Sequence, residues 1–104
     1  MVETKPNVDD SCANYLKALG DPTRLRIVKA LRTGPLTVSD LAELLEVELQ
    51  TVSHHLRILF HAKLLTLQRQ GKFRYYELND CFVKKPQSDY SLELGCCTLG
   101  LRGD

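Results

Sequence analysis

The side chains that could bind a polyanion are concentrated in one part of this sequence. From Gln50 to Tyr76 there is no aspartate or glutamate, although the whole chain has 13 acidic residues and 14 lysines and arginines. A basic segment without acids is typical of a surface that binds phosphates, whereas a solvated surface usually mixes both signs. The cations and histidines of this segment are Arg57, Lys63, Arg69, Lys72, Arg74, His54, His55 and His61.

Four cysteines, Cys12, Cys81, Cys96 and Cys97, form a second group of reactive side chains. The start "MVETKPNVDD" does not resemble a signal peptide, and no apolar run is long enough to span a membrane, so we expect a cytoplasmic protein. In that compartment the cysteines would be thiols rather than structural disulfides.

These thiols predict a soft sulfur site at Cys96 and Cys97, with Cys12 or Cys81 as a third ligand. Such a site suits As(III), or Cd(II), Pb(II) or Cu(I), and no cofactor is required. Adjacent cysteines in a strand point to opposite faces, so both can bind one ion only if Gly95 lets the backbone turn. The alternatives are that Cys12 is a small core residue and that the vicinal thiols sense oxidation or persulfide.

Four helices are expected to position these groups. The first spans about residues 9–19, and the second begins at Pro22 after the N-cap Asp21, ends at Gly34-Pro35 and has Leu25, Val28 and Leu31 facing inward. Thr37 and Asp40 resemble a capping box that opens a short third helix, with Val38, Leu41, Ala42 and Leu45 on its buried face.

A fourth helix opens near Leu49 and has two unlike faces. Its apolar stripe is Val52, Leu56, Leu59 and Phe60, and its polar stripe is Gln50, Ser53, His54, Arg57 and His61. Because successive residues lie about 100° apart around a helix, His54 and His55 are poorly placed to bind one ion. We expect His54 to face the polyanion, with metal ligation as the alternative, and His55 to pack sideways or support the turn. His61 near the helix end is favoured there as a cation.

After Leu65 the period of the pattern changes to that of strands. Leu65 to Gln70 alternates, Gly71-Lys72 turns the chain, and "FRYYEL" continues as the second strand of a hairpin. Past Asp80 we expect at most a brief helical turn, and the tail "YSLELGCCTLGL" alternates like a strand with Gly95 as a bulge. The predicted fold is α+β, mainly α, with a flexible N-terminus (1–8), one domain (9–80) and an extended C-terminal tail (81–104).

Two helices joined by a short turn and followed by a hairpin are the order of a winged helix-turn-helix. A recognition helix needs one exposed stripe of donors and acceptors for base edges in the major groove. The predicted DNA-binding residues are Gln50, Thr51, Ser53, His54 and Arg57 on the helix, with Arg69, Lys72 and Arg74 on the wing. An enzyme is not supported, because the sequence has no CxxC, no glycine-rich phosphate loop and no spacing that suggests a catalytic triad.

The segments "ALGDPTRLRIVKAL", "TVSDLAELLEV", "TVSHHLRIL" and "LQRQGKFRYYEL", in this order over about Tyr15 to Asp80, resemble the ArsR/SmtB repressors. The resemblance implies a homodimeric repressor that leaves its palindromic operator when a metal, metalloid or thiol-reactive signal binds. It also implies that helix one lies at the dimer interface, where we expect the tail to join it, as an intersubunit strand.

The sequence departs from this family at several positions. Glu46 replaces a common glycine in the turn and Glu48 a common serine cap, so we expect a strained turn and a weak cap. Thr37 replaces a common cysteine ligand, and the chain lacks the long last helix with carboxylates and histidines. Zinc sites of those kinds are therefore not expected.

Overall fold

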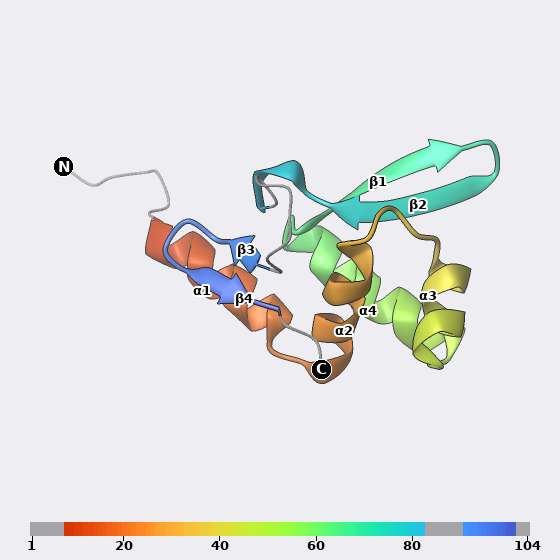
Figure 1. Ribbon diagram of the computed structural model, residues 1–104, viewed down its shortest axis with the longest axis horizontal. Coiled ribbons are helices and arrows are strands. Elements are labelled where there is room, and N and C mark those ends of the chain that lie inside the picture. The colour runs from red at the N-terminus through yellow and green to blue at the C-terminus, as the bar shows by residue number, and fades with distance from the viewer. Residues whose placement is uncertain (1–7, 83–90, 102–104) are drawn as a thin grey trace.

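The computed structural model describes residues 8–82 and 91–101, and Figure 1 shows their arrangement. The helices are α1 (Val8–Leu19), α2 (Pro22–Leu31), α3 (Val38–Leu45), α4 (Leu49–His61) and the 3-10 turn η1 (Asp80–Phe82). The strands are β1 (Leu65–Gln70), β2 (Phe73–Leu78), β3 (Ser91–Glu93) and β4 (Thr98–Gly100). The predicted flexible N-terminus lies outside the described residues, except that α1 already begins at Val8.

Side-chain caps fix where two of the helices begin. The Asp21 carboxylate accepts hydrogen bonds from the backbone N–H groups of Thr23 (2.8 Å) and Arg24 (3.1 Å), as predicted for an N-cap before Pro22. Thr37 and Asp40 form the predicted capping box, in which each side chain accepts the other residue's backbone N–H. These local signals satisfy backbone donors that a helix start otherwise leaves without partners.

One apolar core joins the four helices to the base of the wing. Leu41, Leu56 and Leu59 are completely buried and meet Ile27 and Val28 of α2. Leu25 is only partly buried, and Ile27, which the predicted inward set omitted, is fully buried instead. The prediction that Phe60 lies on the buried stripe of α4 is wrong, because its side chain is 39% exposed. Leu56 and Leu59 face the core, and Phe60 is rotated away from Leu59 around the helix.

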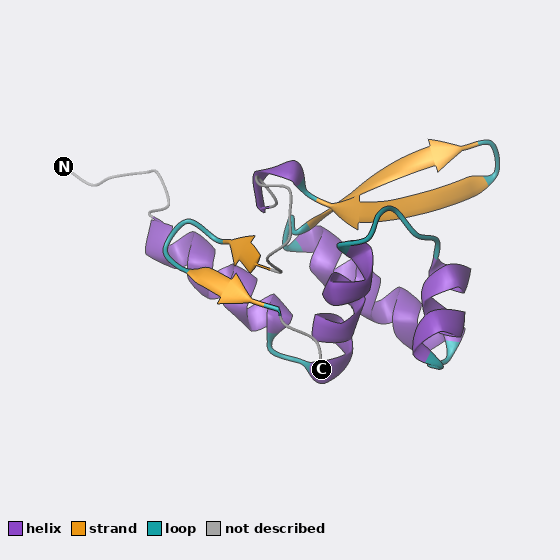
Figure 2. Ribbon diagram, viewed as in Figure 1, coloured by secondary structure: helices purple, strands orange, loops and turns teal. Residues whose placement is uncertain are grey.

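The wing is the predicted antiparallel hairpin. Leu65 pairs with Leu78 at its base and Gln70 with Phe73 at its tip, where Gly71 has a positive φ of 63°. Leu36, between α2 and α3, exchanges hydrogen bonds of 3.0 and 2.8 Å with Tyr76 and anchors the hairpin to the helices. Figure 2 shows this hairpin projecting from a mainly helical body, so the predicted winged helix-turn-helix of class α+β is confirmed.

The tail forms a second, smaller hairpin beside α1 (Figure 1). Strands are present as predicted, and β3 pairs with β4 of the same chain. Gly95 is a turn residue with φ 99° rather than a bulge, and the Leu94 N–H donates to the Cys97 carbonyl at 2.9 Å to close this turn. Leu92, Leu94 and Leu101 are buried, so the hairpin is part of the core.

Among the described residues, no helix has the length and apolar character that crossing a membrane requires.

Candidate nucleic-acid interface and thiol site

Helix α4 presents the predicted polar stripe on its outer side. Gln50, His54 and Arg57 are exposed, while Thr51 and Ser53 are half-buried at the edges of the stripe. The opposite side is held in the core by Val52, Leu56 and Leu59, which are fully buried. A stripe of this kind offers hydrogen-bond donors and acceptors to base edges while the helix stays fixed to the domain.

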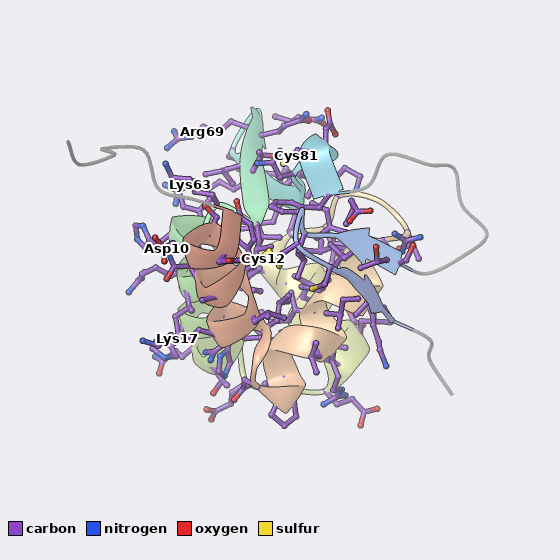
Figure 3. All side chains as sticks on the ribbon, turned by 90° about the vertical axis from the view of Figure 1, so that its left-hand side faces the viewer. Asp10, Cys12, Lys17, Lys63, Arg69 and Cys81 are labelled. Atoms are coloured by element: carbon purple, nitrogen blue, oxygen red, sulfur yellow. A yellow bond between two sulfur atoms is a disulfide. The ribbon has the colours of Figure 1, made fainter. Side chains whose placement is uncertain are left out.

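The wing carries exposed cations near its tip. Arg69 pairs across the hairpin with Arg74, and Lys72 lies in the turn between the strands. A shallow cleft separates the wing from α3 and is lined by side chains of both, including Thr37, Ser39, Lys72 and Arg74. In Figure 3, Lys17, Lys63 and Arg69 project to the same side of the molecule, so the basic character extends from the wing toward α1.

The turn before α4 has both predicted irregularities. Glu46 ends α3 in the left-handed conformation (φ 56°, ψ 48°), which a residue with a side chain rarely adopts. Glu48 occupies the N-cap of α4 and makes no side-chain capping hydrogen bond. The turn is therefore strained and the start of the helix is only weakly capped.

The three histidines of the basic segment have different surroundings. His54 is exposed, and its ring packs edge-on against that of His55 at a centroid distance of 5.3 Å. His55 turns inward, where its Nδ1 lies 3.1 Å from Nη1 of Arg24 and its Nε2 lies 3.9 Å from the Asp21 carboxylate. His61 is exposed in the last turn of α4, and its ring contacts Phe60.

The surroundings of His55 and Asp21 also shift their acidities. Burial lowers the pKa of His55, Asp21 opposes this shift, and Arg24 and His54 add to it. The pKa of Asp21 is lowered chiefly by the Arg24 backbone N–H. His55 is consequently held as the neutral imidazole and Asp21 as the carboxylate near neutral pH.

Comparison with known proteins identifies the architecture. Residues 19–68 match the family model described as a helix-turn-helix domain. The chain is 38% identical to the arsenical resistance operon repressor of Bacillus subtilis (strain 168), over 100% of this chain and 96% of that protein. The chain belongs to the ArsR/SmtB family.

Solved structures agree with this assignment. A crystal structure titled as a possible transcriptional regulator for arsenical resistance is 39% identical and covers 64% of this chain and 69% of its own, with a TM-score of 0.60. The homodimeric winged helix-turn-helix domain of Mb0332 from Mycobacterium bovis is 28% identical, covers 75% of each chain and has a TM-score of 0.65. ArsR/SmtB proteins are DNA-binding transcriptional regulators. As a member of this family, the chain is a DNA-binding transcriptional regulator rather than an enzyme.

In this ArsR/SmtB member, two of the predicted thiols are joined. Cys12 of α1 and Cys96 of the tail form a disulfide with a Cα–Cα distance of 6.2 Å, so the expectation that all four cysteines are free thiols is wrong for this pair. The tail hairpin packs on α1 and brings the two residues within disulfide range. Cys12 is 2% exposed and thus lies in the core, as one alternative predicted.

The sulfurs of Cys12, Cys96 and Cys97 form one thiol cluster, in which Cys97 lies beside the disulfide. The Cys97 Sγ lies 3.7 Å from Sγ of Cys96, and the chain turns at Gly95, which has a positive φ of 99°. This separation is close to the ~3.8 Å between two thiolates on one tetrahedral ion with metal–sulfur bonds of about 2.3 Å. Cys81 is free and exposed on η1, and Figure 3 shows it on a different element from Cys12.

The disulfide removes two of the three thiols that could bind a ligand. Within the described residues, no three His, Cys, Asp or Glu side chains are placed to hold a metal ion. Two of the three clustered sulfurs are bonded to each other, so only Cys97 is a free thiol here. Reduction would restore the three-thiol set, and soft sulfur donors suit metalloids and soft metals.

One side chain that contacts α4, that of Arg24, was not predicted from the sequence. Arg24 connects α1, α2 and α4 through its guanidinium, yet it lies 31 positions from His55 in the sequence. The segment "DPTRL" indicated a helix start, but nothing in its spacing indicates which helix the arginine contacts. Only the assembled fold identifies that partner.

Proposed function

We propose that this ArsR/SmtB member is a homodimeric repressor that binds a palindromic operator in double-stranded DNA in the cytoplasm. A thiol-binding inducer, As(III) or a soft metal ion, releases it from the DNA. The observation that carries the sensing part of this proposal is the convergence of the Cys12, Cys96 and Cys97 sulfurs between α1 and the tail.

Helix α4 would enter the major groove with its exposed stripe. Gln50, Thr51, Ser53 and His54 offer donors and acceptors to base edges, and Arg57 can bind a guanine or a phosphate. The wing residues Arg69, Lys72 and Arg74 would contact the backbone or a neighbouring minor groove. Their exposure and the absence of acids from 51–76 support this arrangement.

Two copies are needed for tight and specific binding, because one small module contacts little DNA. Recognition helices about 34 Å apart would read the two halves of a palindrome. Leu16 on α1 is 43% exposed, which leaves an apolar side chain available for a partner. The similar Mb0332 domain, solved as a homodimer, also supports this assembly.

The inducer would bind the reduced cluster. As(III) enters as As(OH)₃, and three thiols displace its three hydroxyls with release of three waters. Cys12 is the third ligand that the fold favours over Cys81, since its sulfur accepts the Cys96 N–H at 3.1 Å and lies in the same cluster. Binding would pull the Cys96 turn and α1 into a new geometry and disturb the dimer contacts of α1.

A second candidate function follows from the disulfide itself. An oxidant such as hydrogen peroxide converts the two thiols of Cys12 and Cys96 to the disulfide and is reduced to two waters. The protein would then be a repressor that senses oxidation, or persulfide, without a metal. The bond between α1 and the tail is the specific observation that favours it.

Both candidates are tested by DNA binding under defined redox conditions. The probe is a labelled duplex selected from a random library by the reduced wild-type protein, and its affinity is measured by fluorescence anisotropy. As(III) should weaken binding at least about tenfold, equivalent to about 1.4 kcal/mol, in the reduced wild type. The variant Cys96→Ser/Cys97→Ser should bind the duplex equally well and ignore As(III).

The matched control is Cys81→Ser, which removes an exposed free thiol outside the cluster and should respond like wild type. A full As(III) response in the double variant would place the inducer site elsewhere. Loss of binding with peroxide and no metal, reversed by dithiothreitol, would favour the redox candidate.

A further inference from the structure

Arg24 joins three helices through one guanidinium group. Its Nε donates a hydrogen bond of 2.6 Å to the carbonyl of Ala18 near the end of α1. Its Nη1 lies 3.1 Å from Nδ1 of His55 in the middle of α4. Arg24 itself lies in the first turn of α2, where its backbone N–H donates to the capping carboxylate of Asp21. Helix α4 is therefore linked through Arg24 to α1 and α2.

The chemistry of this contact requires one protonation state of His55. A guanidinium has only donors, so Nδ1 of His55 must be the acceptor. The ring is then neutral and carries its proton on Nε2, which lies on the side of Asp21 at 3.9 Å. The His55 side chain is only 14% exposed, so water is a poor substitute for Arg24.

Protonation of His55 would break the contact. A proton on Nδ1 would oppose an Arg24 N–H and place two positive groups 3.1 Å apart. The described charged and titratable groups that face the ring are Asp21 and Arg24 from the start of α2 and His54 from α4. Asp21 would partly compensate the new charge, but neither Asp21 nor His54 can replace the lost hydrogen bond to Arg24.

We propose that Arg24 and neutral His55 are positioning residues for DNA recognition, which hold α4 at its angle to α1 and α2 without contacting DNA themselves. This inference rests on the proposed DNA-binding function. His55 is adjacent to His54 and two positions from Ser53 and Arg57, so a shift of its ring moves the stripe that faces the bases. Acidification would weaken DNA binding through His55.

Two variants separate positioning from contact. In His55→Asn, the amide oxygen can accept the Arg24 hydrogen bond near the position of Nδ1 and cannot be protonated. Arg24→Lys keeps the positive charge but loses the fork that reaches two acceptors. His61→Asn is the matched control, because it removes an exposed histidine from the same helix.

The measurement is affinity for the selected duplex from pH 7.5 to pH 5.0. Acidification affects all other groups alike in both proteins, so the ratio of wild-type to His55→Asn dissociation constants isolates the effect of His55. We expect a ratio near one at pH 7.5 that rises about tenfold at pH 5.0, as for loss of a charge-assisted hydrogen bond. The ratio of the His61→Asn to the His55→Asn dissociation constant should rise at low pH as much as the wild-type ratio does.

Arg24→Lys should bind about tenfold more weakly at pH 7.5 with an unchanged dependence on salt. A lost phosphate contact would instead reduce the salt slope by about one, which would make Arg24 a DNA contact and overturn the proposal. A flat ratio between wild type and His55→Asn would overturn it as well, even if Arg24→Lys fails to fold. If the wild type selects no duplex at all, the proposed function fails before these variants are compared.

Discussion

Cys12 and Cys96 are 84 positions apart in the sequence, yet their Cα atoms lie 6.2 Å apart and their sulfurs are bonded. The bond ties the tail hairpin to α1, and the Cys12 sulfur also contacts the Leu94 carbonyl at 3.1 Å. The same atoms would bind a soft ligand after reduction, so oxidation and inducer binding exclude each other at this cluster.

The disulfide should raise the free energy of unfolding in the oxidised protein. Closing a loop of this length restricts the unfolded chain by an amount equivalent to at most about 4.5 kcal/mol. Denaturant unfolding with and without dithiothreitol should show this difference in the wild type. Cys96→Ser should remove this stability difference, because Cys96 is one half of the disulfide. Cys81→Ser is the matched control: it also replaces an exposed cysteine, but one outside the disulfide, and should retain the difference. Equal stability of oxidised and reduced wild type would contradict the cross-link.

Relief of the strained turn should stabilise the protein. Glu46 has a positive φ of 56°, and glycine adopts this conformation without a Cβ clash. We expect Glu46→Gly to raise the free energy of unfolding by about 1 kcal/mol. Glu43→Gly, at an exposed position inside α3, should lower it by about 1 kcal/mol. If both substitutions destabilise equally, the turn is not the site of strain.

The recognition helix and the wing should differ in what they contribute to DNA binding. Arg57→Ala should weaken binding by about 1–3 kcal/mol and relax the sequence preference, if its guanidinium binds a base. Lys72→Ala should weaken binding to all sequences similarly and reduce the salt slope by about one. Lys29→Ala, exposed on α2, is the control. Selection experiments at several salt concentrations distinguish these effects. If the sequence preference of Arg57→Ala is unchanged, Arg57 contacts the DNA phosphates rather than a base.

Stability should fall in mild acid because of His55. Its pKa is lowered in the folded protein by burial, so below about pH 6.5 the unfolded chain takes up a proton that the folded protein resists. The free energy of unfolding therefore decreases as the pH falls from 6.5 toward the lowered pKa, and levels off below it. Urea unfolding should show this decrease in wild type and a smaller one in His55→Asn. An equal decrease in both proteins would assign it to other groups.

Local chemistry explains why much of the fold was predictable. The Asp21 cap, the Thr37–Asp40 capping box and the Gly71 turn each act within a few residues, and the structure contains all three. The strain at Glu46 was expected because the resembling family commonly has glycine at this position, and Glu46 has a positive φ of 56°. The exposed stripe of α4 followed from a helical period that also fixes which residues enter the core.

Contacts between distant segments were not predictable in the same way. Cys12 has Cys96 as its partner because the tail folds back on α1, a packing that no short-range pattern encodes. His55 was expected to pack sideways or support the turn, but its contact with Arg24 depends on how α2 and α4 cross. Phe60 fits an apolar stripe by spacing and is still exposed, since Leu56 and Leu59 already fill the core beneath α4.

The central claim is that the outer face of α4 binds DNA, and backbone amide NMR of the labelled full-length protein tests it most directly. On addition of the selected duplex, we expect the largest chemical-shift changes in residues 50–57 and 69–74, with smaller changes in β3 and β4. Binding that leaves the signals of residues 50–57 unchanged while those of the tail hairpin shift would contradict the claim.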